Sequence, residues 1–176
     1  MDIRMITKEN KEDILLPNQA FPIRGKLLVN YHNQTWSHSV QLAETIEWQT
    51  FPDEPYNFEE MEKEFHFIGA YDDNTCVELA ILQEDMFNYI YLYDLKINQD
   101  YRKQGIASQL IEKSKEIALS KGYRGIRTIA QDNNLNACLF YLSQGFEIGG
   151  FNTHDYKGTQ QEGNADIYFY LDCENT

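Results

Sequence analysis

The feature of the sequence that most constrains the fold is a strand-to-helix junction between residues 89 and 121. The run YIYLYDLKI, Tyr89–Ile97, is rich in aromatic and branched residues, as is typical of a central strand. Beyond the charged turn that follows it, apolar residues recur at helical spacing and stop at Gly122. The next apolar run is YRGIRTIAQ. Because a helix separates the two strands, we expect parallel neighbours joined by a right-handed crossover.

Short strands and helices continue through the rest of this half of the chain. FHFIGAY and CVELAIL flank the turn DDNT and predict an antiparallel hairpin. A second helix is expected to begin in DNNLNA, where asparagines can cap exposed amides, and to end at Gly145. Its apolar face is predicted to carry Leu135, Cys138, Leu139 and Leu142. FEIGGFN and ADIYFYL are the last strands, and the polar loop THDYKGTQQEGN between them has the length of a functional loop.

The first 57 residues have an irregular pattern. It favours a strand near Gly25–Tyr31 and a helix or strand near Val40–Gln49. At 176 residues and 42% hydrophobic, the chain is expected to form one compact α/β domain, residues 1–176, with helices on both faces of its sheet.

Composition excludes several classes of protein. No apolar run approaches the roughly 20 residues that span a bilayer, and the start MDIRMITKENKED lacks the apolar core of a secretory signal, so we expect a cytoplasmic protein. A formal net charge of −13 disfavours nucleic acid and favours cationic partners. Cys76, Cys138 and Cys173 form no CxxC pair, which predicts buried free thiols rather than disulfides or a metal site.

The turn RKQGIA has the chemistry of an anion site. The first amides of a helix have no intrahelical acceptor, and the helix dipole adds partial positive charge. Gly105 and Ala107 are small enough to let an anion approach the backbone, and Arg102 and Lys103 add full charges. A glycine before a helix is also ordinary turn chemistry. Neither GxGxxG nor GxxxxGK(S/T) occurs in the chain.

The order of strand, RKQGIA, helix, strand, Asn-rich turn and FYLSQGF resembles the GNAT superfamily of acetyl-coenzyme A dependent N-acetyltransferases over roughly residues 65–171. The resemblance implies a mixed α/β sheet of about six or seven strands, splayed between its two parallel strands, with coenzyme A in the splay and no metal. The residues that it assigns to the cofactor are Leu95, Lys96 and Ile97 on the strand, Arg102, Lys103, Gln104, Gly105, Ile106, Ala107 and Ser108 at the helix start, Asn133 or Asn136, and Tyr141.

The implied reaction needs a base and an acid. A primary amine with a pKa of about 10.4 is almost fully protonated at neutral pH, so another group must accept its proton. By resemblance Asp94 is the first candidate, and Glu78 is the second because a carboxylate in an apolar strand must face solvent or serve a site. His154 beside Asp155 is a further candidate. Tyr141 is expected beside the cofactor sulfur as proton donor, with simple packing as the alternative.

Three stretches, KINQDYRKQGIASQLI, GFEIGGFNTHDY and TQQEGNADIYFYL, are similar to the streptothricin acetyltransferases, bacterial resistance enzymes that acetylate the β-lysine part of that antibiotic. A polycationic substrate agrees with the eight acidic residues between Glu44 and Glu64. By resemblance, this tract is expected on the first helices of the fold, and residues 1–57 are expected to form a wall of the acceptor site. A solvated acidic face is an equal alternative. The residues expected to hold the cation are Glu47, Asp53, Glu54, Asp94, Asp155, Glu162 and Asp166.

Other functions stay open at this point. The chain could acetylate polyamines, aminoglycosides or protein amino groups, or it could bind acetyl coenzyme A without catalysis. A purely structural role is disfavoured by the charged turn. The sequence also leaves open which amino group reacts and whether the chain forms a homodimer.

Overall fold

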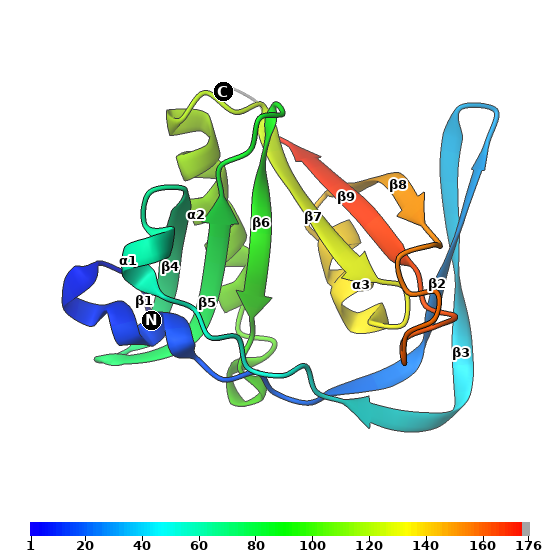
Figure 1. Ribbon diagram of the computed structural model, residues 1–176, viewed down its shortest axis with the longest axis horizontal. Helices are drawn as coiled ribbons and strands as arrows, with labels where there is room; N and C mark the ends of the chain where they lie inside the picture. The colour runs from blue at the N-terminus through cyan, green and yellow to red at the C-terminus, as the bar shows by residue number, and fades with distance from the viewer. Residues whose placement is uncertain (174–176) are drawn as a thin grey trace. The chain divides into compact units, whose positions relative to one another are not determined.

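A computed structural model describes residues 1–173 of the chain (Figure 1). Its strands are β1 (Asp2–Met5), β2 (Phe21–His32), β3 (Thr35–Gln49), β4 (Phe65–Asp72), β5 (Thr75–Gln83), β6 (Tyr89–Lys96), β7 (Gly125–Gln131), β8 (Glu147–Asn152) and β9 (Asp166–Asp172). Its helices are α1 (Phe58–Met61), α2 (Ile106–Ser120) and α3 (Leu135–Ser143), with the 3-10 helices η1 (Lys8–Leu15) and η2 (Gln99–Tyr101). The strands and helices predicted from residue 65 onward are confirmed.

The strands form a mixed seven-stranded sheet in the order β1-β4-β5-β6-β7-β9-β8, and a separate two-stranded sheet of β2 and β3. β6 and β7 are parallel, as expected for strands joined by α2. Their register covers three residue pairs, from Tyr89–Gly125 to Tyr91–Arg127, although β6 continues to Lys96. The predicted hairpin of β4 and β5 is antiparallel, and so is the pair of β8 and β9.

The chain divides into two compact units. The first unit comprises residues 1–19, 50–127 and 172–173; the second comprises residues 20–49 and 128–171. That the whole chain acts as one domain stays a prediction.

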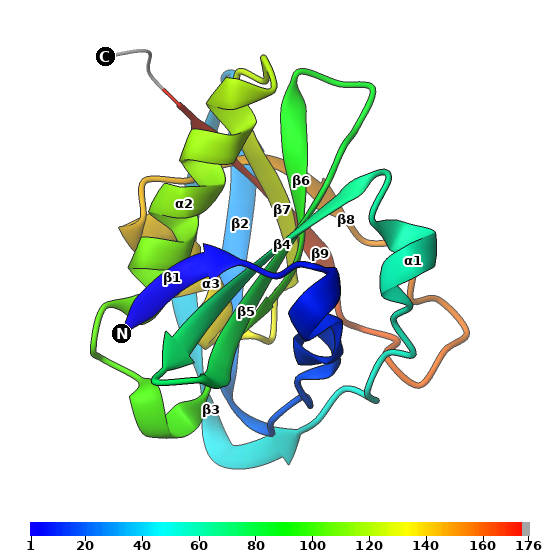
Figure 2. The ribbon, with the colours of Figure 1, turned by 90° about the vertical axis from the view of Figure 1, so that its left-hand side faces the viewer.

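In the first unit, helices cover both faces of the strands. Figure 2 shows α2 on one side of β4 and β5, and η1 with α1 on the other side. The buried side chains of α2 recur at helical spacing and form a single face: Ile106, Leu110, Ile111, Ser114 and Ala118. On the side of η1 and α1 the strands bury a hydrophobic cluster of Ile6, Ile14, Phe58, Phe67, Tyr71, Cys76, Leu79 and Ile81. We call the two sides of this sheet the α2 face and the η1 face.

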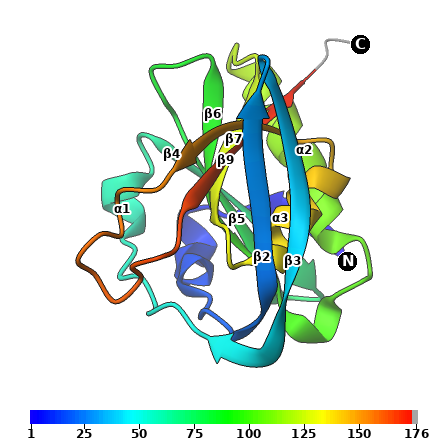
Figure 3. The same cartoon turned by 90° about the vertical axis from the view of Figure 1, so that its right-hand side faces the viewer.

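The second unit contains the longest strands. β2 and β3 pair in antiparallel register from Phe21–Gln49 to His32–Thr35 and lie side by side in Figure 3. The strand expected near Gly25–Tyr31 is confirmed. Of the helix or strand expected near Val40–Gln49, the structure shows a strand, β3, and the two long strands occupy much of residues 1–57. Nearly all of β3 is exposed, although its apolar residues at even positions, among them Val40, Leu42 and Ile46, alternate with mostly polar residues in the pattern of a strand.

The second helix of the prediction is α3, and its buried face differs from the expected one. The asparagine cap is confirmed: Asn134 Oδ1 accepts a hydrogen bond of 3.3 Å from the amide of Ala137. Leu139 is 41% exposed, so the prediction that it lies on the apolar face is wrong. The helix instead turns Tyr141 inward, where the ring packs against Phe146 and Phe169 at centroid distances of 5.3 and 5.6 Å.

Only a short part of the acidic tract Glu44–Glu64 lies on a helix, whereas the prediction placed the tract on the first helices of the fold. It runs through β3, the extended residues 50–57 and the single turn of α1. Glu44 and Glu47 belong to a strand, since β3 pairs with β2 along most of its length.

The three cysteines are buried free thiols, as predicted. Burial raises the pKa of Cys76 and Cys138 to about 12, so both stay protonated at neutral pH. Within residues 1–173, no helix is long and apolar enough to cross a membrane.

Candidate active site

The turn that leads into α2 is held in place by its neighbours. Asn98 Oδ1 accepts a hydrogen bond of 3.0 Å from the amide of Asp100 and so starts η2. The hydroxyl of Tyr101, the last residue of η2, donates to Asp72 Oδ2 at 2.8 Å, which ties the turn to the end of β4. These two bonds fix the backbone immediately before Arg102.

The start of α2 offers amides that no side chain caps. Gly105 is the N-cap and has a left-handed backbone, with φ of 74°. The first intrahelical hydrogen bond runs from the amide of Gln109 to the Gly105 carbonyl at 3.2 Å, so the preceding amides lack an intrahelical acceptor. Those amides belong to Ile106, Ala107 and Ser108. The side chains around them are exposed: Arg102, Lys103 and Gln104. This arrangement can bind an anion.

A β-bulge changes the direction of side chains on β6. The register with β5 passes from Leu82–Leu92 to Ile81–Asp94, so Tyr93 is an extra residue. Without a bulge, Tyr91 and Asp94 would face opposite sides, because side chains alternate along a strand. The bulge places both on the η1 face, which Ile81 also faces. Bulges of this kind are frequent beside active sites.

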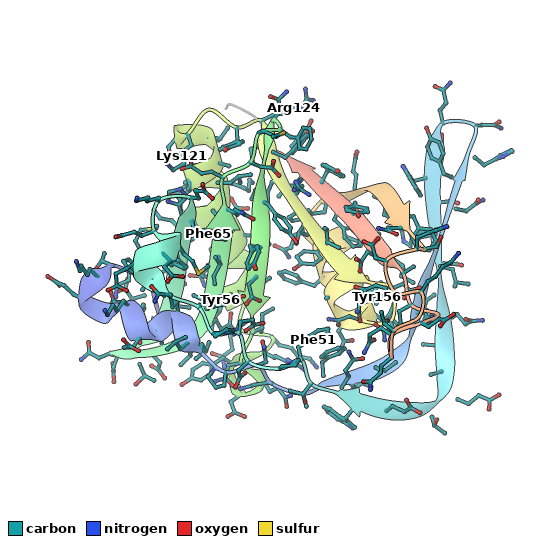
Figure 4. The ribbon with its side chains drawn as sticks, viewed as in Figure 1. Phe51, Tyr56, Phe65, Lys121, Arg124 and Tyr156 are labelled. Atoms are coloured by element: carbon teal, nitrogen blue, oxygen red, sulfur yellow. The ribbon has the colours of Figure 1, made fainter. Side chains whose placement is uncertain are left out.

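Asp94 belongs to a charged network inside the first unit. The hydroxyl of Tyr56, labelled in Figure 4, donates a hydrogen bond of 2.9 Å to Asp94 Oδ2. Lys96 Nζ lies 3.8 Å from the same oxygen and 2.7 Å from Glu54 Oε2. Lys96 is only 7% exposed and also donates to the Leu16 carbonyl at 2.8 Å. Because two carboxylates share one ammonium group, the network with both ionised keeps a net negative charge.

The two carboxylates of this network have different pKa shifts. Burial raises the pKa of Asp94 and outweighs the hydrogen bond from Tyr56 and the charge of Lys96, which both act to lower it. Burial also acts to raise the pKa of Glu54, but its hydrogen bonds from Lys96 and Asn18 lower it overall. Asp94 is therefore the more basic carboxylate and the better proton acceptor.

Glu78 lies on the α2 face, opposite Asp94. It pairs in register with Ala70, is 1% exposed, and neither of its carboxylate oxygens has a hydrogen-bond partner among the described residues. Burial raises the pKa of Glu78 to about 7, and the charge of Arg102 acts to lower it. The structure thus separates the first two candidate bases, Asp94 and Glu78, onto opposite faces of one sheet.

The strand residues assigned to the cofactor also pair with β5. Leu95 and Lys96 lie opposite Ala80 and Leu79, and Ile97 follows the end of β6. The side chain of Lys96 is held by Glu54, so only its backbone is available to a ligand. A cofactor role for these three residues stays a prediction.

In the second unit, α3 and the turn before it carry the other predicted cofactor residues. Asn133 is buried, and its Oδ1 has no hydrogen-bond partner within residues 1–173, so it could accept a bond from a ligand N–H group. Asn136 is exposed. Tyr141 is 7% exposed and packs among aromatic rings, so it also has a structural role. Its catalytic role stays a prediction.

The acidic residues predicted to hold a cation are distributed over both units. In the second unit Glu47, Asp155 and Glu162 are exposed. Asp166 accepts a hydrogen bond of 2.7 Å from the Tyr156 hydroxyl, and burial raises the pKa of Asp166. In the first unit Asp53 Oδ1 accepts a bond of 2.6 Å from the Asn18 amide. No group of three His, Cys, Asp or Glu side chains within residues 1–173 is arranged to hold a metal.

The chain belongs to the acetyltransferase (GNAT) family, whose model matches residues 29–146, and it is an N-acetyltransferase by fold and family. It is similar to streptothricin acetyltransferase A of Bacillus subtilis (strain 168), with 25% identity over 169 residues, 96% of this chain and 98% of that protein. It is 33% identical over 103 residues to the streptothricin acetyltransferase of Escherichia coli, covering 58% of this chain and 59% of that one.

Two solved structures share the fold. The first is a protein of Bacillus anthracis str. Ames, assigned as a streptothricin acetyltransferase and solved in complex with acetyl coenzyme A. Its TM-score is 0.87 at 24% identity, and the match covers 97% of this chain and 98% of that chain. A nourseothricin acetyltransferase has a TM-score of 0.80 at 19% identity and covers 98% of both chains.

The sequence analysis missed Tyr56 and the ion pair of Lys96. Tyr56 and Asp94 are 38 positions apart, and no local pattern indicates their contact. Lys96 did carry a signal, because a lysine two positions after an aspartate in an apolar strand is expected on the same face. A buried charge on that face requires a partner, which is Glu54 here.

Proposed function

We propose that this protein transfers an acetyl group from acetyl coenzyme A to an amino group in the β-lysine part of streptothricin, and so gives resistance to that antibiotic. The observation that carries the proposal is the start of α2, where uncapped amides, the left-handed Gly105 and two exposed cations occur together. Similarity to streptothricin acetyltransferase A over 96% of the chain supports the choice of substrate.

The first turn of α2 would hold the diphosphate of the cofactor. A Cβ atom on Gly105 would have no neighbour within 4 Å, so the space beside the amides is open. Arg102 and Lys103 flank the same amides and would pair with the phosphate oxygens. The residues proposed for the remaining contacts are Gln104, Ser108, the backbone of Leu95 to Ile97, and Asn133 or Asn136. Acetyl coenzyme A supplies an acetyl thioester.

Asp94 is the proposed base. The amine must lose a proton before its lone pair can form the new C–N bond, and Asp94 would accept that proton directly or through one water. Burial already raises its pKa, which makes the carboxylate a stronger base than an exposed aspartate. Glu78 is the second candidate.

Tyr141 is the proposed acid. As the C–S bond breaks, its hydroxyl would donate a proton to the departing sulfur. An ordinary phenol with a pKa of about 10 is protonated at neutral pH and can do so.

Acidic side chains would bind the remaining ammonium groups of the substrate. The proposed set consists of Glu47, Asp53, Glu54, Asp155, Glu162 and Asp166. The net charge of −13 supports this choice, because it favours the approach of a polycation.

Mass spectrometry after incubation with acetyl coenzyme A and a panel of amines tests the proposal. The panel contains streptothricin, a polyamine, an aminoglycoside and a lysine-containing peptide. We expect streptothricin to gain one acetyl group, which fragmentation locates in the β-lysine part. Acetylation of another amine with streptothricin unchanged would make the substrate assignment wrong. Binding of coenzyme A with no acetylated product would favour a non-catalytic binding module instead.

A further inference from the structure

Four aromatic side chains gather beside Asp94 on the η1 face of the first unit. They come from three segments: Tyr56 before α1, Phe65 at the start of β4, and Tyr91 and Tyr93 on β6. Tyr93 lies at the centre of the group. The centroid of its ring is 6.1, 5.3 and 5.8 Å from the ring centroids of Tyr56, Phe65 and Tyr91, respectively. We call these four residues the aromatic cluster.

The β6 bulge joins this cluster to the carboxylate. Phe65 and Tyr91 both pair in register with Gln83, so they share one face of the sheet. The extra residue Tyr93 brings Asp94 onto that face, and the Tyr56 hydroxyl bonds directly to Asp94 at 2.9 Å. Aromatic rings and an ionisable oxygen are thus presented on one surface.

Two rings of the cluster already contact cations of the protein. The guanidinium carbon of Arg127 lies 4.5 Å from the centroid of Tyr91, and Lys96 Nζ lies 5.4 Å from that of Tyr56. Arg127 is fixed by Asp85 through bonds of 3.1 and 2.5 Å. Cations within about 6 Å of a ring centroid are attracted by the ring's electrons. The cluster therefore has the composition and electrostatics of a cation-binding surface.

Ordinary core packing explains only part of the cluster. Tyr56 and Phe65 are partly buried and pack against the hydrophobic cluster of the η1 face. Tyr93 is different, because it is 41% exposed although three rings surround it. Within residues 1–173, no cation lies over its ring. An exposed tyrosine held by three rings next to a carboxylate is a preformed surface for a ligand.

We propose that the aromatic cluster recognises an alkylammonium group of the acceptor, with Tyr93 as its main contact and Asp94 as its counter-ion. The inference rests on the proposed function, which supplies an amine acceptor, and adds the side chains that select it. The rings pack against the alkyl chain and attract the positive charge, and the Asp94 oxygen faces the nitrogen. A neutral group of the same shape keeps the packing and loses the attraction.

Calorimetry without acetyl coenzyme A tests this proposal separately from the enzyme reaction. The probes are choline and 3,3-dimethyl-1-butanol, which have the same shape but differ in charge, and neither contains an amine that can be acetylated. We expect the intact chain to bind choline about 3- to 30-fold more tightly than the alcohol. Tyr93→Leu should abolish most of that preference, and Tyr93→Phe should retain most of it because the ring remains.

Tyr31→Leu is the matched control, since Tyr31 is an exposed aromatic residue on β2 outside the cluster. It should leave choline binding unchanged. Equal affinity for the two probes, no binding of choline, or an unchanged preference in Tyr93→Leu would overturn the proposal. Because the readout is binding, these results are distinct from a failure to acetylate streptothricin, which concerns the proposed function alone.

Discussion

The hydroxyl of Tyr56 donates a hydrogen bond of 2.9 Å to the carboxylate of Asp94. This bond links the segment before α1 to the bulged strand β6, and Lys96 lies 3.8 Å from the same oxygen. Burial raises the pKa of Asp94, whereas the hydrogen bond from Tyr56 lowers it by stabilising the charged carboxylate. The pair therefore controls the pH at which Asp94 can accept a proton.

Tyr56→Phe removes this donor and keeps the ring. Because the bond stabilises the carboxylate, its loss should raise the pKa of Asp94 further. The acidic limb of the pH profile of kcat/KM should then move to higher pH by about one unit. Tyr89→Phe is the control, since it removes a similar bond to Asp172 on an exposed surface. An acidic limb that stays in place in Tyr56→Phe would show that Asp94 does not limit the reaction.

Asp94→Asn tests the base itself. Asparagine keeps the size of the side chain but cannot accept the proton of an ammonium group, so kcat should fall by about 10²- to 10⁴-fold. Steady-state kinetics at saturating acetyl coenzyme A measure this, and the affinity for coenzyme A should stay the same. Asp73→Asn, in the exposed turn between β4 and β5, should retain full activity. Near-normal turnover of Asp94→Asn would exclude it as the base and favour Glu78.

Glu78→Gln should change how stability depends on pH. Burial raises the pKa of Glu78 from 4.5 to about 7 in the folded protein, so the folded state binds its proton more tightly than the unfolded state. The contribution of this group to the free energy of unfolding is fully present below pH 4.5. About 2 to 3 kcal/mol of it is lost as the pH rises through 7.

Urea unfolding of wild type and Glu78→Gln at pH 5 and pH 8 measures this difference. The variant should be the more stable protein at pH 8, with little difference at pH 5. Glu147→Gln, at an exposed position of β8, should follow the wild type at both pH values. If Glu78→Gln loses stability equally at both pH values, then Glu78 is charged and paired in the folded protein.

The sequence predicted the part of the fold where local pattern and tertiary structure agree. The run Tyr89–Ile97 and the helix from Ile106 form β6 and α2 as expected, with a turn at Arg102 between them. β6 and α2 bury side chains at regular spacing, so their hydrophobic periodicity is visible in the sequence. The interpretation of Gly105, Arg102 and Lys103 as an anion site likewise rests on residues that are neighbours in the sequence.

The remaining features depend on contacts between distant residues. The choice between Leu139 and Tyr141 on α3 depends on the aromatic neighbours of Tyr141. The bulge at Tyr93 comes from the register between two strands, and it decides that Asp94 joins Tyr56 and Tyr91 on one face. For this reason the base could be proposed from the sequence, but the aromatic cluster around it could not.

The most direct test of the account is the affinity of coenzyme A for two glycine variants, measured by calorimetry. Gly105 and Gly122 have positive φ angles of 74° and 82°, and a Cβ atom on either would meet no neighbour within 4 Å. Gly105→Ala and Gly122→Ala should therefore lose similar stability, about 1 kcal/mol each. Only Gly105→Ala adds a methyl group beside the amides of α2, and it should weaken coenzyme A binding by about tenfold or more, whereas Gly122→Ala should bind as the wild type does. Equal affinity of the two variants would contradict the placement of the diphosphate at the start of α2.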